Sequence, residues 1–329
     1  MQWPCASLPG ASLRDRTTIR VGGPVEWLLE PASPDELREV VALARERDFE
    51  IRVLGGGANV IIEDQGLGGV AIGTERLNRV FRPVGMDGEI GDGLSGELPA
   101  ARMALPPPAQ DPRLVAWARA PLPKLCRAAR DLGFSGLEKM SGVPGQLGGG
   151  IAMNAGGKDP DGTLWQMSDV VERIRVVDRD GEFMDIHREE WNPAYRDGRL
   201  EERIVVGAVL RFEPRPKPEV VERSKDYLRK KNAVQPVSEK SAGCIWKNPD
   251  PEISDGRTAG KLVDGAGAKG MRSGDAVISE RHGNFLVNAG SASASDVFGL
   301  IERVEAIVLE STGVPLEREV RLWRSERTD

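Results

Sequence analysis

The chain has 329 residues, and its 45 Lys and Arg residues against 51 Asp and Glu residues give a net charge of −6. This acidic balance argues against a broad nucleic-acid-binding or anionic-membrane-binding surface. With 29% charged and 40% hydrophobic residues the composition is that of a soluble globular protein, and the length predicts about two domains.

Three features of the sequence indicate the cellular compartment of the protein. No stretch of about 18 consecutive apolar residues occurs, so we expect no membrane-spanning helix. Residues 1–16 lack the basic segment and apolar core of a secretory signal. Three cysteines, Cys5, Cys126 and Cys244, are too few for a disulfide framework, which favours a reducing cytoplasm.

The first residues with a clear pattern predict a helix followed by two strands. Residues 33–49 carry the signals of a helix start, because Ser33 and Glu36 form a capping box and Pro34 occupies the first helical position. Apolar and β-branched residues at 51–54 and 58–62 predict strands on either side of three consecutive glycines.

The rest of the chain alternates irregular and regular segments. Residues 84–112 contain three consecutive prolines and many glycines, and we expect a surface insertion there. Apolar residues around an Asp180-Gly181 turn predict a β-hairpin. The other predicted elements are a helix at 123–132, the hairpin strands at 171–177 and 183–186, a strand at 203–212, a helix at 296–310 and a strand at 318–323.

Two glycine-rich segments, LGGGANVII at 54–62 and SGVPGQLGGGIAMNAGG at 141–157, are the most unusual feature of the sequence. Glycine lets backbone N–H groups approach an anion without a side-chain collision, so a pyrophosphate is the expected ligand of two such segments. Tight turns without a ligand are the alternative. Strand-like residues follow the first segment, which argues against a Rossmann fingerprint, and no Walker A motif occurs. The remaining hypothesis is that the two segments bind a dinucleotide mainly through loops.

Three separate residues have side chains suited to catalysis. Cys244 can act as a nucleophile if activated, or as a proton donor, because a thiol with a pKa of about 8.5 is mostly protonated at neutral pH. A buried structural cysteine is the alternative. Arg196 and Glu319, taken alone, are most simply exposed surface charges. We expect no metal site, since three cysteines and two histidines show no close ligand spacing.

Seven separated blocks carry a family pattern: TTIRVGG (17–23), LGGGANVII (54–62), SGVPGQLGGGIAMNAGG (141–157), AYR (194–196), QPVSEKSAGCIWKNP (235–249), SERHGNFLVN (279–288) and LEREV (316–320). With these blocks in order and at matching spacing, the chain resembles the UDP-N-acetylenolpyruvoylglucosamine reductase (MurB) family over nearly its whole length. It resembles the shorter type, which lacks a long tyrosine-bearing insertion.

The resemblance implies an α+β fold, with an FAD-binding fold of the vanillyl-alcohol-oxidase (PCMH) type and a smaller α+β substrate-binding domain. We expect the FAD-binding region at 1–213, with two subdomains at about 1–83 and 113–213 around the insertion. The substrate-binding domain is expected at 214–329, where closely spaced prolines mark the boundary.

The resemblance also implies roles for individual residues. Arg196 falls on the catalytic arginine of the family, Cys244 on its proton donor and Glu319 on its catalytic glutamate. The implied substrate-binding residues are Tyr195, Lys247, Asn248 and His282. The implied FAD-binding residues are Gly55, Gly56, Gly57, Ala58, Asn59, Val60, Gly142, Val143, Pro144, Gly145, Gly148, Gly149, Asn154, Ala155 and Gly156.

The implied reaction is the NADPH-dependent reduction of UDP-N-acetylglucosamine-enolpyruvate to UDP-N-acetylmuramate through FAD, in peptidoglycan precursor synthesis. Hydride addition to the enolpyruvyl group leaves negative charge on the adjacent carbon and carboxylate. Arg196 would stabilise this charge, Cys244 would protonate the carbanion, and Glu319 would orient or help to protonate it. The implied partner is a UDP-sugar, with no nucleic acid or membrane, and we expect a monomer or a weak dimer.

Two other functions stay open. A flavin oxidase of the same superfamily acting on a sugar or lactone is disfavoured by the blocks around Cys244 and Glu319. The second is a non-catalytic flavin- or nucleotide-binding homologue. It is suggested by Ala118-Arg119-Ala120, because the family carries a glycine-containing turn near the flavin at this position. Trp246 also departs from the family, in which phenylalanine is common at this position. Turnover of NADPH would separate the enzyme from the non-catalytic protein.

Overall fold

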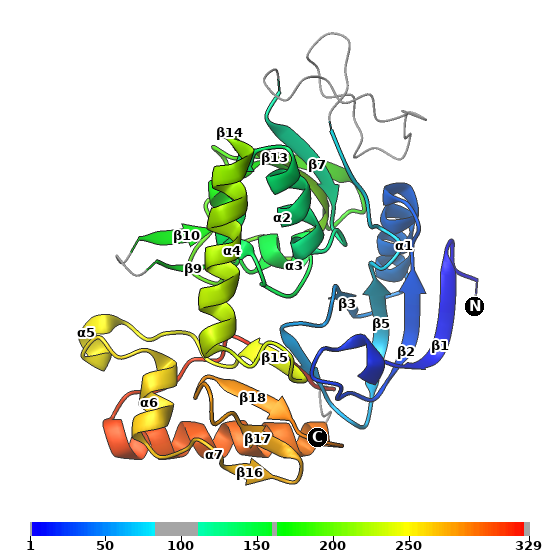
Figure 1. Cartoon of the computed structure of the whole chain (residues 1–329). Coiled ribbons are helices and arrows are strands. Elements are labelled where there is room, and N and C mark those ends of the chain that lie inside the picture. Colours follow the sequence, from blue (N-terminus) through cyan, green and yellow to red (C-terminus); the bar gives the residue numbers. More distant parts are fainter. Residues whose placement is uncertain (1, 83–110, 160–162, 326–329) are drawn as a thin grey trace. The chain divides into compact units, whose positions relative to one another are not determined.

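The computed structural model describes residues 2–82, 111–159 and 163–325, so the predicted insertion at 84–112 lies outside the described residues except for its last two positions (Figure 1). The chain divides into two compact units, each drawn from several separate stretches of sequence. Unit 1 consists of residues 1–8, 28–56 and 70–230, and unit 2 consists of residues 9–27, 57–69 and 231–329.

This division is discontinuous, whereas the predicted boundary at 213/214 assumes two continuous domains. Residues 9–27 belong to unit 2 because Ile19 and Val21 are buried in the same hydrophobic core as the C-terminal helix. Residues 57–69 join the same unit, with Ile61 in that core. The extents of the functional domains therefore stay a prediction.

Helix α1 (Pro34–Glu46) begins where the sequence predicts. The hydroxyl of Ser33 accepts a hydrogen bond from the Glu36 N–H at 3.1 Å, and Pro34 occupies the first turn. The Glu36 carboxylate accepts from the N–H of Ala32, one residue before the predicted partner. The buried face of the helix consists of Leu37, Val40, Val41 and Ala44.

Unit 1 contains a five-stranded antiparallel sheet with the order β12-β11-β13-β7-β6. The predicted hairpin is confirmed, since β11 (Val171–Val177) pairs with β12 (Phe183–His187) at one edge of the sheet. The central strand, β13 (Ile204–Arg211), is buried over all but its last residue, as a strand flanked on both sides should be. The other two strands are β7 (Arg113–Trp117) and β6 (Val80–Phe81).

Helices α2 (Leu122–Asp131) and α3 (Leu147–Ala152) share one hydrophobic core with this sheet. Leu125 and Ala129 of α2 are fully buried, and Ala128 and Leu132 pack against the same core while partly buried. The short elements of unit 1 are β8 (Phe134–Ser135), η2 (Glu138–Met140), β9 (Gly156–Lys158), β10 (Leu164–Gln166), η3 (Met167–Asp169) and β14 (Glu213–Pro214).

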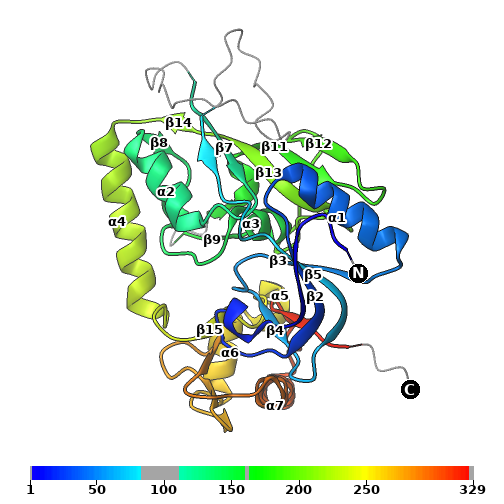
Figure 2. The same ribbon diagram turned by 90° about the vertical axis from the view of Figure 1, so that its right-hand side faces the viewer.

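Helix α4 (Lys217–Val234) follows β14, and its residues up to Lys230 belong to unit 1. It runs beside α2 and β8 (Figure 2). Its buried residues are Val220 and Ser224, so polar contacts contribute much of its attachment. None of the described helices is both long enough and apolar enough to cross a membrane.

Strands β1 (Ala6–Ser12), β2 (Pro24–Glu30), β5 (Leu67–Gly73) and β3 (Ile51–Leu54) form a sheet in that order. Strand β3 confirms the strand predicted at 51–54. It runs parallel to β5 and pairs Leu54 with Gly73. The end of β3 therefore leads directly into the first glycine-rich segment.

Unit 2 contains a sheet with the order β15-β18-β17-β16, against which α7 (Ala294–Thr312) packs (Figure 1). Helix α7 extends the predicted helix at both ends, because Ser293 and Asp296 form a capping box and Gly313 ends the helix with a φ of +70°. The remaining elements are η1 (Arg14–Arg16), β15 (Ser241–Cys244), α5 (Pro251–Ser254), α6 (Ala259–Gly265), β16 (Arg272–Ser273), β17 (Ala276–Ile278) and β18 (Phe285–Asn288).

Two short strands of unit 2 join distant parts of the sequence. Strand β4 (Val60–Ile62) follows the first glycine-rich segment and pairs in parallel with β19 (Arg321–Trp323). Both confirm predicted strands, although each is shorter than expected. The pairing brings the C-terminal residues beside the glycine-rich segment.

Candidate active site

The two glycine-rich segments meet in unit 1. A Cβ atom built on Gly56 would lie 2.1 Å from Oε1 of Gln146, and one built on Gly55 would lie 3.5 Å from the same atom. The first segment therefore passes directly against the residue that precedes α3. Sequence reasoning did not single out Gln146, because its one signal is its position inside the second segment.

The second segment turns sharply before it becomes helical. Gly142 and Gly145 have φ values of +78° and +118°, a region that L side chains rarely adopt. The carbonyl of Gly145 accepts a hydrogen bond from the N–H of Leu122 at 3.0 Å, which fixes the turn to the start of α2. Val143 packs against the core of unit 1, and Pro144 is exposed. Gly148 and Gly149 follow within α3.

The turn at Ala118–Ala120, which departs from the family pattern, supports this segment. The carbonyls of Ala118 and Ala120 accept hydrogen bonds from the N–H groups of Gly148 at 2.8 Å and Leu147 at 3.0 Å. Both alanine side chains are buried in the core of unit 1. The methyl groups are accommodated in the core, and the turn still supports the start of α3 through its backbone.

Asn154 links the end of the second segment to the turn that carries Arg196. Its side chain is 1% exposed, and its Nδ2 donates to the Ala194 carbonyl at 3.2 Å and to Oε1 of Gln166 at 2.8 Å. Its Oδ1 accepts from the N–H of Ser168 at 3.1 Å. Both polar atoms of its side chain thus hold neighbouring backbone and side chains together. Ala155 continues from it into β9.

Arg196 occupies a tight turn with a φ of +58°. The N–H of Ala194 donates to the carbonyl of Asp197 at 2.8 Å, and the N–H of Asp197 donates back at 3.2 Å. Nη2 of Arg196 donates to the carbonyl of Gly156 at 2.8 Å. The guanidinium carbon lies 4.9 Å from the ring centroid of Tyr195, which is exposed. The predicted catalytic arginine therefore contacts Gly156, the last of the residues predicted to bind FAD.

In unit 2 the first segment continues at Gly57, which has a φ of +61°. A Cβ atom at this position would lie 2.2 Å from the carbonyl oxygen of Arg16, so a glycine is required. The hydroxyl of Thr18 lies 3.1 Å from the carbonyl oxygen of Gly57 and 2.6 Å from that of Ser241. Thr18, which sequence reasoning did not select, thus links the glycine-rich segment to β15.

Asn59 connects the same segment to the C-terminal residues. Its Nδ2 donates to the carbonyl of Glu319 at 3.2 Å, and its own carbonyl accepts from the N–H of Arg321 at 3.0 Å. Ala58 lies close to β15, since a Cβ atom on Gly243 would be 3.7 Å from the Ala58 carbonyl oxygen. Val60 then begins β4.

Cys244 is half-buried at the end of β15, opposite Phe285 of β18. An irregularity in the pairing precedes it, and Gly243 has a φ of +79°. The carbonyl of the next residue, Ile245, accepts a hydrogen bond from the N–H of Glu319 at 2.8 Å. The chain after Cys244 therefore runs beside the chain around Glu319.

A buried tryptophan reinforces this pairing. Trp246 is fully buried and forms an antiparallel bridge with Arg318. Its Nε1 donates to Oε1 of Glu305 on α7 at 2.9 Å, and the guanidinium of Arg318 binds the same carboxylate at 2.7 and 2.6 Å. Asn284 holds the other side, with Nδ2 2.8 Å from the Trp246 carbonyl. Glu305 and Asn284 were not predicted, since their effect depends on contacts distant in sequence.

Lys247 and Asn248, which follow Trp246 in the sequence, make contacts within the protein. Nζ of Lys247 forms an ion pair with Glu317 at 2.6 Å. Oδ1 of Asn248 accepts from the N–H of Ala259 at 3.1 Å, at the first residue of α6. These contacts fix both side chains in the segment that follows the strand of Cys244.

His282 lies next to Phe285, the residue opposite Cys244, with the two ring centroids 5.0 Å apart. Its Nδ1 accepts a hydrogen bond from the N–H of Asn284 at 3.2 Å. Burial and, secondarily, the charge of Lys269 lower the pKa of His282 below its ordinary value. The ring is therefore neutral at neutral pH and offers hydrogen bonds without charge.

The glycine-rich segments fit a dinucleotide cofactor. Gly149 is exposed, has no positive φ, and has no described atom within 4 Å of the position of a Cβ. The backbone of Gly149 is therefore open to the close approach of a ligand, which is compatible with a dinucleotide bound along this segment. Among the described residues no group of three or more His, Cys, Asp or Glu is placed to hold a metal ion.

Comparison with known proteins gives this site its class. Residues 25–91 match the family described as FAD binding domain, and residues 235–323 match the family described as UDP-N-acetylenolpyruvoylglucosamine reductase, C-terminal domain. The chain is thus an α+β flavoprotein oxidoreductase with the FAD-binding fold of the vanillyl-alcohol-oxidase type. It belongs to the UDP-N-acetylenolpyruvoylglucosamine reductase family.

Relatives match over nearly the whole chain. The UDP-N-acetylenolpyruvoylglucosamine reductase of Carboxydothermus hydrogenoformans is 32% identical over 96% of this chain and 93% of its own length. A second such reductase, from Symbiobacterium thermophilum, is 34% identical over 94% and 90%. The crystal structure of MurB from Thermus caldophilus, 33% identical, covers 97% of this chain and 98% of its own with a TM-score of 0.73. The predicted family, fold class and FAD cofactor are confirmed.

Proposed function

We propose that this protein reduces UDP-N-acetylglucosamine-enolpyruvate to UDP-N-acetylmuramate, with NADPH as the hydride donor and FAD as the carrier, in peptidoglycan precursor synthesis. Family membership over the whole chain supports the reaction. The observation that carries the residue assignments is the hydrogen bond between Glu319 and Ile245, which aligns Glu319 with Cys244, while Asn59 of the glycine-rich segment binds the Glu319 carbonyl.

The two glycine-rich segments would hold FAD. Their backbone N–H groups can bind a pyrophosphate without side-chain collision. When bound, FAD supplies the hydride that adds to the terminal carbon of the enolpyruvyl double bond.

Arg196 stabilises the charge that this addition creates. Negative charge develops on the adjacent carbon and its carboxylate, and a preorganised guanidinium can stabilise such charge by several kcal/mol. The tight turn at 194–197 and the hydrogen bond to Gly156 hold the arginine in place before the substrate binds.

Cys244 donates the proton that completes the reduction. A thiol is protonated at neutral pH and more acidic than a serine hydroxyl, so it can deliver a proton to a carbanion. Glu319 orients the intermediate or assists this transfer. Tyr195, Lys247, Asn248 and His282 are proposed to bind the UDP-sugar.

The same proposal includes a cytoplasmic location and a monomeric or weakly dimeric state. Support for the location comes from the three cysteines, none of which is in a disulfide.

Anaerobic stopped-flow absorbance near 450 nm tests these assignments. NADPH should bleach the flavin, and UDP-N-acetylglucosamine-enolpyruvate should restore its absorbance. We expect Cys244→Ala to keep bleaching and lose recovery, and Cys244→Ser to keep part of the recovery. Cys5→Ala, the same change at a cysteine outside the proposed site, should behave as the wild type. Loss of both half-reactions in Cys244→Ala with an unchanged flavin spectrum would reject the proton-donor role.

Bleaching without recovery in the wild type would keep the flavin reductase and reject the enolpyruvyl substrate. A protein that binds FAD without oxidising NADPH would instead be the non-catalytic homologue. A single stopped-flow absorbance trace distinguishes these two outcomes, because bleaching depends on NADPH alone and recovery depends on the second substrate.

A further inference from the structure

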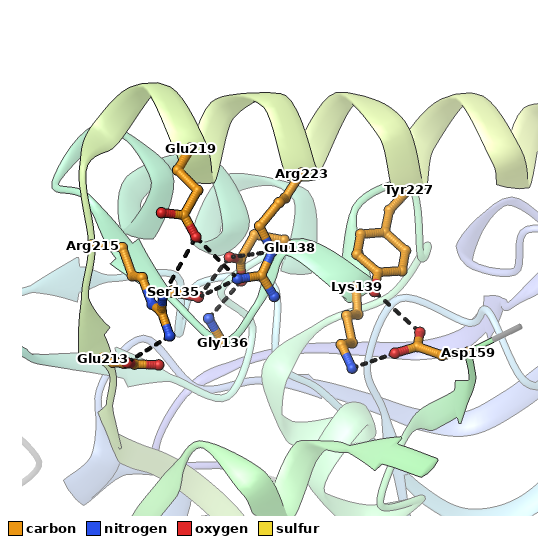
Figure 3. Close-up of polar contacts among 10 residues, drawn as sticks. All are labelled: Ser135, Gly136, Glu138, Lys139, Asp159, Glu213, Arg215, Glu219, Arg223 and Tyr227. Atoms are coloured by element: carbon orange, nitrogen blue, oxygen red, sulfur yellow. Dashed lines mark hydrogen bonds and ion pairs between the residues drawn. The ribbon is translucent and has the colours of Figure 1, made fainter. Parts of the chain in front are cut away.

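One face of α4 contacts the residues on either side of the second glycine-rich segment. Val220, Arg223 and Tyr227 lie three or four residues apart, so they share one face of the helix. Val220 is buried, and Figure 3 shows that Arg223 and Tyr227 reach from this side of α4 toward residues of unit 1. All of these residues belong to unit 1.

The first contact lies just before the segment. Glu138 in η2 is 3% exposed, and its carboxylate accepts hydrogen bonds from the hydroxyl of Ser135 at 2.7 Å and from the N–H of Gly136. Nε of Arg223 lies 3.7 Å from the same carboxylate (Figure 3). A buried carboxylate needs such partners, since an unpaired buried charge is strongly destabilising.

The second contact lies just after the segment. The hydroxyl of Tyr227 lies 3.1 Å from Oδ1 of Asp159, and Nζ of Lys139 lies 2.6 Å from Oδ2 of the same carboxylate (Figure 3). Lys139 precedes the segment and Asp159 follows it, so this carboxylate joins the two ends of the loop to each other and to α4. The side chain of Asp159 is 12% exposed, which limits screening by water.

Tyr227 is a hydrogen-bond donor over the whole working pH range. Burial and the neighbouring Asp159 raise its pKa to about 12. Its hydroxyl is therefore protonated at neutral pH and donates to the carboxylate. A hydrogen bond to a charged acceptor is stronger than one between neutral groups.

The ion pair is also close in sequence to the residue that holds Arg196. Asp159 directly follows β9, and β9 begins at Gly156, whose carbonyl accepts the hydrogen bond from Nη2 of Arg196. Displacement of Asp159 would thus shift β9, and with it the acceptor that orients the guanidinium. No residue of the group Tyr227, Asp159 and Lys139 needs to touch the substrate for this effect.

We propose that Tyr227, acting with Asp159 and Lys139, is a positioning residue that holds the second glycine-rich segment and, through β9, Arg196 in the conformation needed for FAD binding and substrate reduction. The inference rests on the proposed function of the glycine-rich segments and of Arg196. It adds α4, which carries none of the predicted site residues, to the parts of the chain that determine the reaction.

The test compares Tyr227→Phe with Arg229→Gln in the full-length protein. Arg229 lies on the same helix, is 78% exposed in its side chain, and pairs only with a surface aspartate among the contacts shown for it. FAD affinity is measured on the apoprotein by flavin fluorescence, and both half-reactions are followed at saturating FAD. We expect Tyr227→Phe to weaken FAD binding about fivefold and slow recovery about fivefold, roughly the effect of one net hydrogen bond.

Bleaching by NADPH should stay within about twofold of the wild type, because its hydride transfer does not use Arg196. Lys139→Met should reproduce the effect of Tyr227→Phe, and Lys139→Arg, which keeps the charge, should restore most of it. This split between half-reactions, with rescue by arginine, is not expected of a residue that only stabilises the fold.

The inference is overturned if FAD affinity and recovery in Tyr227→Phe both match Arg229→Gln, whatever happens to the melting temperature. Equal slowing of bleaching and recovery would overturn it as well. If the wild type does not recover with the enolpyruvyl sugar, the proposed function fails, and the FAD affinities alone then decide the role of Tyr227.

Discussion

The backbone N–H of Glu319 donates to the carbonyl of Ile245 at 2.8 Å, although the two residues are far apart in sequence. The N–H of Lys247 donates to the carbonyl of Glu317 at the same distance. The C-terminal segment therefore behaves as an added strand beside the chain that follows Cys244. The proton donor and the glutamate proposed for the reaction are held at neighbouring positions by backbone bonds, which do not depend on the chemistry of either side chain.

Replacement of Trp246 by Phe should weaken this pairing. The indole Nε1 donates to Glu305, whose carboxylate also binds Arg318, the residue before Glu319. Phenylalanine fits the buried site but lacks the donor, and the smaller ring leaves space unfilled. We expect Trp246→Phe to lower the free energy of unfolding by about 1–3 kcal/mol, measured by urea denaturation, and to slow flavin recovery more than flavin bleaching.

Trp323→Phe is the matched control, since it makes the same side-chain change in β19, where the residue is only partly buried. Its half-reactions should match the wild type. If Trp246→Phe recovers as fast as Trp323→Phe, the bond to Glu305 contributes to stability but not to the placement of Cys244 and Glu319.

Local patterns predicted the regular elements well. The start of α1 followed from Ser33 and Pro34, and the hairpin of β11 and β12 followed from alternating residues around Asp180-Gly181, because caps and tight turns are set by neighbours in the sequence. The start of α7 could have been predicted in the same way, from the spacing of Ser293 and Asp296.

Local patterns could not predict contacts between residues that are distant in the sequence. No local signal shows that Thr18 bonds to Ser241 or that Tyr227 reaches Asp159, because each is a polar residue whose role depends on the tertiary fold. The same reason explains why unit 2 takes residues 9–27 and 57–69 from the N-terminal part of the chain. Family resemblance located the proposed site residues, and the structure adds the side chains that hold them.

Gly149→Ala separates cofactor binding from folding. No described atom lies within 4 Å of the position of a Cβ on Gly149, and the residue lies inside α3. Alanine favours a helix over glycine by about 0.5–1 kcal/mol, so the free energy of unfolding of the apoprotein should stay the same or rise slightly. If the glycine-rich segment binds FAD closely, the added methyl group should weaken FAD affinity at least tenfold, measured by fluorescence titration.

Two other alanine variants bracket this result. Gly68→Ala adds the same methyl group outside both glycine-rich segments, where nothing lies within 4 Å, and should not change FAD affinity. Gly57→Ala, by contrast, forces a Cβ to within 2.2 Å of the Arg16 carbonyl oxygen at a φ of +61° and should lower stability. An unchanged FAD affinity in Gly149→Ala would mean that the cofactor does not approach α3 at this residue.

The environment of His282 makes stability depend on pH. Burial and Lys269 lower the pKa of His282 in the folded protein below the ordinary value of 6.5. As pH falls through that value, the unfolded chain takes up a proton that the folded chain resists. The unfolded state is thereby favoured, so stability is lost as pH falls from about 7 toward 5 and is retained at higher pH.

We therefore expect His282→Asn to lose less stability than the wild type between pH 7.5 and pH 5.5. Asparagine keeps an acceptor for the N–H of Asn284 but cannot take up a proton. Urea denaturation at the two pH values gives the difference, and carboxylates contribute equally to both proteins. His187→Asn, at the exposed end of β12, removes the other histidine of the chain and serves as the control. If His282→Asn and the wild type lose the same free energy of unfolding, His282 takes up its proton equally in the folded and the unfolded state. Its surroundings in the folded protein would then not oppose its charge.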